Sequence, residues 1–116
     1  MSLKTELMSG GIPAAPAGRI GFDPIANVTP GGSTQADAVK LVSNFSNLAT
    51  GTGGVIITQT HAEHLIINNS GATITIYPPV GSFMNNGSVN AGVTLTNTSR
   101  MLIKEAGPQF VTFTSA

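Results

Sequence analysis

The sequence predicts an all-β protein, a small antiparallel sandwich or jelly-roll-like domain that follows an extended N-terminal arm. Short runs of β-branched and aromatic residues recur from residue 36 onward, and several alternate with polar residues, which is the pattern of half-buried strands. Residues 1–35 differ, because they hold four of the seven prolines and six of the fourteen glycines. That density interrupts helices and strand ladders. We therefore expect an arm over 1–35 and one β domain over 36–116.

Charge is almost absent from the middle of the chain. Between Lys40 and Arg100 the only charged residue is Glu63, and 23 of the 59 residues from 41 to 99 are Asn, Ser or Thr. In a typical soluble domain about a quarter of all residues are charged. The surface of this segment is therefore predicted to consist of neutral hydroxyl and amide groups. The formal net charge is zero. The chain therefore lacks the basic stripe that nucleic-acid binding needs, and its neutrality favours association.

Several other classes of protein are disfavoured by what the sequence lacks. It contains no cysteine, so it has neither disulfides nor a thiolate ligand. No segment approaches the roughly 18 consecutive apolar residues of a membrane span. Its first residues, MSLKTELMSGG, lack the apolar run of a signal peptide. We expect synthesis in the cytoplasm and no membrane partner.

Two strands are predicted at the start of the β domain, and the second has the clearer pattern. We interpret 36–43 as the first strand, although a short helical turn fits the same residues, and 44–50 is polar and ambiguous. The β-branched run 55–57 follows two glycines and predicts the next strand. The glycine-rich segment 51–54 is interpreted as a turn, because the Lys-Ser/Thr of a phosphate-binding loop does not follow it.

Residues 60–64 (THAEH) are the only segment with a helical pattern. Thr60 precedes Glu63 by three residues, which is the spacing of a capping box. On a helix, His61 and His64 would share one face and could supply two ligands to a metal. A closed tetrahedral site needs four ligands, and the nearby sequence does not supply the others. We therefore favour histidines that hydrogen-bond to the backbone of a polar loop, and we predict no metal.

The most distinct predicted element is a hairpin. Its strands are 65–68 and 73–77, the second of which alternates isoleucine with threonine and tyrosine. The linking residues 69–72 contain Asn and Gly, which tolerate the positive φ of hairpin turns. The prolines at 78 and 79 end the second strand, since neither can donate to a ladder.

The last third of the chain predicts three more strands. The elements in order are a loop over 80–86 and strands over 88–96, 100–104 and 109–114, with a turn at 105–108. We expect the loop to place Phe83 and Met84 under the sheet. Alternation in the last strand places Phe110 and Thr112 on the face opposite Val111 and Phe113. The predicted core residues are Ile66, Ile74, Ile76, Leu95, Phe110 and Phe113.

Catalytic arrangements do not emerge from the sequence. No serine stands in a G-x-S-x-G elbow, and the carboxylates are too widely spaced to predict a paired-carboxylate hydrolase. They are Glu6, Asp23, Asp37, Glu63 and Glu105. We predict that the protein is not an enzyme and uses no cofactor.

An ordered set of motifs runs through the last two thirds of the chain. It comprises Gly54-Val55-Ile56-Ile57, then Leu65-Ile66-Ile67-Asn68-Asn69-Ser70-Gly71-Ala72, Ile74-Thr75-Ile76-Tyr77-Pro78, Gly81, Asn85-Asn86, Asn90-Ala91 and Phe110. From Gln35 to the C-terminus this order resembles a β module found repeatedly in virion proteins of tailed phages. The closing strand lacks the tryptophan of that family, and the arm lies outside the family pattern.

The resemblance implies a structural part of a virion. The short free-standing chain favours a head decoration (cement) protein, which would bind the major capsid protein on the outer surface of a phage capsid, as a homotrimer, and stabilise the shell. The alternative is a tail or fibre module that binds host-surface glycan. Tyr77 together with Asn68, Asn69, Asn85 and Asn86 would then supply the sugar-binding face.

Apolar residues recur within the arm. Ile12, Ile20, Phe22 and Ile25 are spaced among its glycines and prolines, unlike the residues of most disordered segments. One interpretation is a flexible leader. The one we favour is an extended arm whose apolar side chains dock on the capsid or on a neighbouring subunit, where burial contributes about 25 cal/mol per Å².

Overall fold

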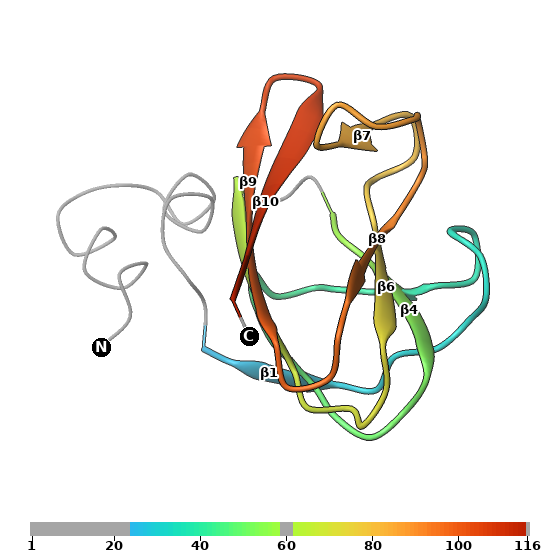
Figure 1. The fold of residues 1–116 in the computed structure, drawn as a ribbon, viewed down its shortest axis with the longest axis vertical. Helices are drawn as coiled ribbons and strands as arrows, with labels where there is room; N and C mark the ends of the chain where they lie inside the picture. Colours follow the sequence, from blue (N-terminus) through green and yellow to red (C-terminus); the bar gives the residue numbers. More distant parts are fainter. Residues whose placement is uncertain (1–23, 59–61, 116) are drawn as a thin grey trace, which may run out of the picture.

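The computed structural model describes residues 24–58 and 62–115, which form two β-sheets packed face to face without a helix (Figure 1). Sheet A contains, in spatial order, β1 (Ala26–Val28), β3 (Phe45–Leu48), β5 (Glu63–Asn68), β9 (Arg100–Ala106), β10 (Gln109–Ser115) and β7 (Phe83–Met84). Sheet B contains β2 (Val39–Lys40), β4 (Gly53–Ile56), β6 (Ile74–Tyr77) and β8 (Val93–Leu95). The all-β prediction is confirmed. None of the described residues belongs to a helix that could cross a membrane.

The chain changes sheet at every strand from β1 to β6. As a result β1, β3 and β5 lie parallel in sheet A, and β2, β4 and β6 lie parallel in sheet B. This path is a three-coil β-solenoid, in which a strand of one sheet serves as the crossover that parallel strands of the other sheet require. In sheet A each coil advances by twenty residues, since Ala26 lies opposite Ser46 and Ser46 lies opposite Ile66.

The remaining strands close the far end of the solenoid. β9 pairs antiparallel with β5 and with β10, and β8 pairs antiparallel with β6. The predicted antiparallel sandwich is therefore wrong in its strand directions, because most strand pairs are parallel. Local alternation of apolar and polar residues is the same for both directions, so it could not reveal the difference.

The predicted hairpin of 65–68 and 73–77 is also wrong, since β5 and β6 belong to different sheets. The cause is Asn68, whose side chain is fully buried. Its Nδ2 donates to the carbonyl oxygens of Ala72 (2.9 Å) and Leu95 (2.8 Å). Its Oδ1 accepts from the backbone N–H (3.0 Å) and hydroxyl (2.6 Å) of Ser70. These bonds hold 69–72 as an arch that carries the chain from one sheet to the other.

The predicted helical segment 60–64 is corrected over its described residues. Glu63 and His64 begin β5, where Glu63 lies opposite Lys104 and His64 lies opposite Ile103. Pairing with β9 therefore overrides the local capping-box pattern, because the ladder satisfies more backbone groups than a single helical turn would. Thr60 and His61 lie outside the described residues.

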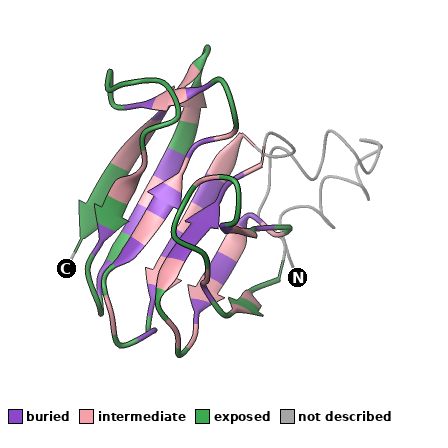
Figure 2. Ribbon diagram, turned by 90° about the vertical axis from the view of Figure 1, so that its right-hand side faces the viewer, coloured by how far each residue is buried: buried purple, intermediate pink, exposed green. Residues whose placement is uncertain are grey.

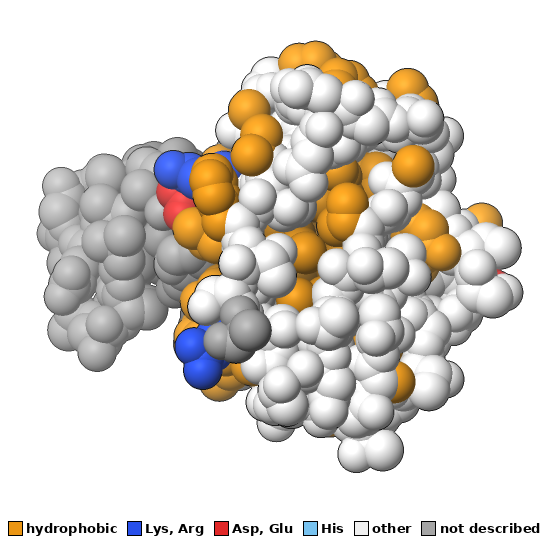
Figure 3. All heavy atoms as spheres, viewed as in Figure 1, with side chains coloured by type: hydrophobic (Ala, Val, Ile, Leu, Met, Phe, Trp, Pro, Cys, Tyr) orange, Lys and Arg blue, Asp and Glu red, His pale blue; other side chains and the backbone are white. Residues whose placement is uncertain are grey.

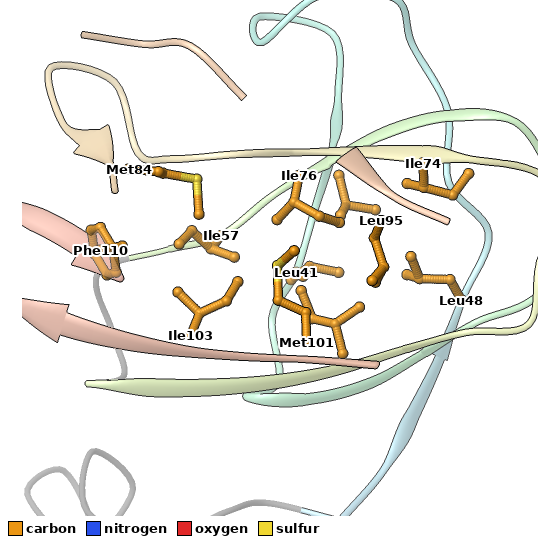
Figure 4. Close-up of a cluster of buried hydrophobic side chains, with 12 residues drawn as sticks. Leu41, Leu48, Ile57, Ile74, Ile76, Met84, Leu95, Met101, Ile103 and Phe110 are labelled. Carbon is orange, nitrogen blue, oxygen red and sulfur yellow. The ribbon is translucent and has the colours of Figure 1, made fainter. Parts of the chain in front are cut away.

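The core fills the space between the two sheets (Figure 4). It comprises Leu41, Leu48, Val55, Ile57, Ile66, Ile74, Ile76, Met84, Leu95, Met101, Ile103 and Phe110. Five of the six predicted core residues are among them, but Phe113 is 56% exposed. It stands three residues after the buried Phe110, and an odd spacing on a strand points to the opposite face. Buried and less buried residues alternate along the strands of Figure 2.

Several strands follow the sequence closely. The segments 36–43 and 88–96 contain β2 and β8, whereas 100–104 and 109–114 lie within the longer strands β9 and β10. Met84 is buried, as expected of the loop after β6, whereas Phe83 is only partly so. The polar segment 44–50 contains β3, and β1 lies within the range that composition assigns to the arm.

A tight turn precedes β2 and depends on Asp37. One carboxylate oxygen accepts from the backbone N–H groups of Ser33 (3.0 Å) and Thr34 (2.7 Å) and from the Thr34 hydroxyl (2.9 Å). The hydrogen bond from the Thr34 backbone N–H contributes most to lowering the pKa of Asp37 below its ordinary value, and the bond from the Thr34 hydroxyl contributes next. The charged carboxylate is therefore part of the turn that leads the first coil into sheet B.

Candidate interaction surface

A row of apolar side chains crosses the outer face of sheet A. Phe45 lies opposite Leu65, Leu65 opposite Leu102, and Leu102 opposite Phe113. Residues directly opposite one another in neighbouring strands project from the same face of a sheet. Because the buried Ile66 follows Leu65 in β5, this row faces away from the core.

The row begins at the edge of the sheet with Ile25. The register of β1 with β3 places Ile25, which immediately precedes β1, in line with Phe45. Ile25 is 50% exposed and Phe113, at the other end of the row, is 56% exposed. Ile67 and Val111 project from the same face, two residues from Leu65 and from Phe113 respectively. We call this surface the apolar face of sheet A: Ile25, Phe45, Leu65, Ile67, Leu102, Val111 and Phe113.

Charged residues lie at the borders of this face. At one border Glu63 and Lys104 form a cross-strand pair, with Nζ 3.9 Å from Oε1. At the other, Arg100 lies opposite Ile67. Figure 3 shows hydrophobic side chains together with a few charged ones on the side where sheet A lies. An apolar centre with a charged rim is the usual arrangement of a protein–protein interface. The exposed ion pair itself contributes only about 0–1 kcal/mol.

Asparagines form a ladder beside this face. The Nδ2 of Asn47 donates to Oδ1 of Asn27 (3.1 Å), and the Nδ2 of Asn69 donates to Oδ1 of Asn47 (2.6 Å). The three residues come from successive coils, so the ladder runs along the axis of the solenoid. Such stacked amides stabilise parallel strands. Part of the asparagine content is therefore explained by structure.

The residues predicted for docking are only partly placed. Ile12, Ile20 and Phe22 lie outside the described residues, and Ile25 stands at one end of the apolar face. The other members of the face were missed by the sequence analysis. The available signal was two runs of adjacent apolar residues, Leu65-Ile66-Ile67 and Met101-Leu102-Ile103. Consecutive apolar residues on a strand make both of its faces apolar.

Of the two candidate metal ligands, the structure places only His64. His61 lies outside the described residues, whereas His64 points into the core from β5 and is buried. Its Nε2 lies 3.1 Å from the carbonyl oxygen of Thr58, to which the protonated nitrogen donates. Within 24–58 and 62–115, no group of three or more His, Cys, Asp or Glu side chains is placed to hold a metal ion.

The candidate sugar-binding residues do not gather on one face. Asn68 is buried in the arch between β5 and β6. Tyr77 belongs to sheet B, and its hydroxyl donates to the carbonyl oxygen of Ser33 (3.4 Å). Asn85 follows β7 at the edge of sheet A, where its side chain donates to Thr112 (2.8 Å). The structure thus uses these residues at three separate places.

Comparisons with known proteins add no relative. A scan against protein-family models, a search of curated proteins and a search of solved structures each found no significant match.

Proposed function

We propose that the protein is a structural component of a tailed-phage virion, a decoration protein that binds the outer surface of the capsid and stabilises the shell. The observation that carries the proposal is the apolar face of sheet A. The face is exposed at its two ends, Ile25 and Phe113, and half-buried between them. Contiguous apolar surface rimmed by polar residues marks a site of protein association. The choice of a virion, with the major capsid protein as partner, is supported by the resemblance of residues 35–116 to virion modules.

The proposed action is mechanical. Burying the apolar face against a capsid subunit contributes about 25 cal/mol for each Å² of apolar surface removed from water. A homotrimer would present three such faces to neighbouring capsomers, so that opening the shell requires several contacts to break together. A rigid solenoid suits this role, because little conformational entropy is lost when a preorganised surface binds.

The test is co-sedimentation of the purified protein with undecorated capsids. We expect saturable binding by the wild-type protein and at least about tenfold weaker binding by Phe113→Asp, which places a charge in the apolar face. The matched control is Val80→Asp, because Val80 is 75% exposed and lies between β6 and β7, outside that face. Far-ultraviolet circular dichroism should show that both variants fold.

Two results would count against this proposal. Equal binding by Phe113→Asp and the wild-type protein would exclude the apolar face as the contact. No binding by the wild-type protein would exclude decoration, and a glycan array would then test the tail or fibre module.

A further inference from the structure

The outer face of sheet B carries the ring of Tyr77 between two glycines. Ile76 is fully buried between the sheets, so Tyr77, the next residue of β6, projects outward. Gly54 belongs to β4 and Gly92 immediately precedes β8, and these two strands flank β6. A Cβ on Gly54 would lie 2.8 Å from Cε2 of the ring, and a Cβ on Gly92 would lie 3.0 Å from Cδ1. The ring therefore fills the space on both sides that neighbouring side chains would occupy.

This geometry lays the ring flat on the sheet. Cδ1 and Cε2 are opposite corners of a tyrosine ring, and each lies beside the Cβ position of a different neighbouring strand. A ring that stood upright from β6 could not reach both positions at once. The hydroxyl of Tyr77 donates to the carbonyl oxygen of Ser33 (3.4 Å), which holds the far end of the ring. Because Tyr77 is only partly buried, its ring presents a face to solvent.

Two amide side chains are held in fixed orientations beside this ring. Nε2 of Gln35 donates to the carbonyl oxygen of Pro78 (2.8 Å), the residue after Tyr77, and to Oδ1 of Asn90 (3.3 Å). Oδ1 of Asn90 also accepts from the backbone N–H of Gly81 (2.7 Å). A backbone carbonyl requires the nitrogen of an amide and a backbone N–H requires its oxygen. The backbone thus determines which way both amides point.

Each of these amides retains one group for a ligand. Neither Oε1 of Gln35 nor Nδ2 of Asn90 bonds to another of the described residues. The surroundings are uncharged, because residues 29–36 and 78–92 contain no Asp, Glu, Lys or Arg. We call this surface the Tyr77 site: Gln35, Tyr77 and Asn90. It combines a flat aromatic face with one oriented acceptor and one oriented donor.

We propose that the Tyr77 site binds a neutral hexopyranose unit of a saccharide. The C–H face of the sugar packs on the tyrosine ring, Oε1 of Gln35 accepts from one hydroxyl, and Nδ2 of Asn90 donates to another hydroxyl oxygen. A phosphate or carboxylate ligand is disfavoured, because the site offers no cation to pair with it. Of the sugar-binding residues expected from the sequence, only Tyr77 takes part.

This proposal goes beyond the proposed function. The two sheets pack face to face, so the Tyr77 site on sheet B and the apolar face of sheet A lie on opposite sides of the molecule. Binding of a saccharide therefore leaves the apolar face free. Capsid co-sedimentation and saccharide binding are separate measurements, so failure of one proposal is distinguishable from failure of the other.

The test is an NMR titration of the full-length protein with the methyl glycosides of glucose, galactose, mannose and N-acetylglucosamine. We expect at least one of them to shift the signals of the Tyr77 ring and of the Asn90 side-chain amide, with a Kd of about 1–10 mM, because few contacts form on a flat surface. Tyr77→Val should weaken this binding at least about fivefold by removing the ring. Tyr77→Phe is the matched control and should retain it, because the ring remains.

The wild-type titration decides the question even if Tyr77→Val fails to fold. Signals of Tyr77 and Asn90 that stay unchanged at about 50 mM of every glycoside overturn the proposal. Shifts confined to other parts of the protein also overturn it. The same conclusion follows if Tyr77→Val binds as tightly as the wild-type protein, or if Tyr77→Phe loses as much affinity as Tyr77→Val.

Discussion

At the scale of single residues, Asn68 decides the path of the chain. All four hydrogen-bonding positions of its amide are used, by Ala72, Leu95 and twice by Ser70. Its backbone N–H donates to Ser99 (2.9 Å), and its carbonyl accepts from Thr98 (2.8 Å). The side chain thus joins the β5–β6 arch to the end of β8, and the backbone of the same residue joins it to the segment before β9. A polar network of this kind is specific because every member must be satisfied.

Removing this side chain should strongly destabilise the protein. For Asn68→Ala we expect a loss of about 2–4 kcal/mol in the free energy of unfolding, because buried donors and acceptors are left unpaired. Asn69→Ala is the control. Asn69 is exposed, and its side chain bonds to Asn47, so we expect a loss of no more than about 0.5–1 kcal/mol. Urea unfolding of both variants measures the difference, and equal losses would contradict the role of Asn68.

At the scale of elements, β4 and β6 pack closely because of glycine. A Cβ built on Gly54 would lie 2.8 Å from Cε2 of Tyr77 and 3.0 Å from the carbonyl oxygen of Thr75. The Tyr77 ring therefore occupies the space that a side chain would take. The same glycine exchanges two backbone hydrogen bonds of 3.1 Å with Gly31. The first two coils are thus connected at a point where both backbones lack side chains.

A methyl group at this point should disturb both contacts. We expect Gly54→Ala to reduce the free energy of unfolding by about 1–3 kcal/mol, since the tyrosine ring must move. At Gly31 a Cβ would meet only Cγ2 of Val39 at 3.5 Å, which is ordinary contact. Gly31→Ala is therefore the control and should cost less than about 1 kcal/mol. Thermal unfolding compares them, and a Gly54→Ala protein as stable as the control would show that Tyr77 adapts freely.

At the scale of the whole molecule, the proposed function requires assembly. The described residues carry few charges, and the apolar face occupies one side of sheet A. Two kinds of contact can be distinguished there, one with a capsid and one with further copies of this chain. If the face contacts the capsid, a substitution in the face leaves the oligomer intact. If the face contacts further copies of the chain, the same substitution dissociates the oligomer.

Sedimentation equilibrium separates these contacts. From the proposed function we expect a homotrimer, with three times the chain mass of 11.8 kDa. Phe113→Asp should keep that mass, because the face is reserved for the capsid. Val80→Asp serves again as the control. Dissociation caused only by Phe113→Asp would identify the face as a subunit interface and would contradict its assignment to the capsid.

The candidate surface was foreseeable only in part. Alternation along 109–114 separates Phe113 from Phe110, yet both were assigned to the core, because a phenylalanine is usually buried. The row from Ile25 to Phe113 depends on the order β1-β3-β5-β9-β10. That order joins residues from distant parts of the chain, and nothing local specifies it.

The sequence by itself determined where most strands run and which residues interrupt them. Apolar alternation, the glycines and the prolines at 78 and 79 are local signals, and each acts within a few residues. The tertiary structure decided sheet membership, strand direction and the outward face. These depend on which distant strand satisfies each ladder and on whether a polar side chain such as Asn68 finds buried partners. A turn with Asn and Gly suits a hairpin and an arch equally, and the inward amide of Asn68 selects the arch.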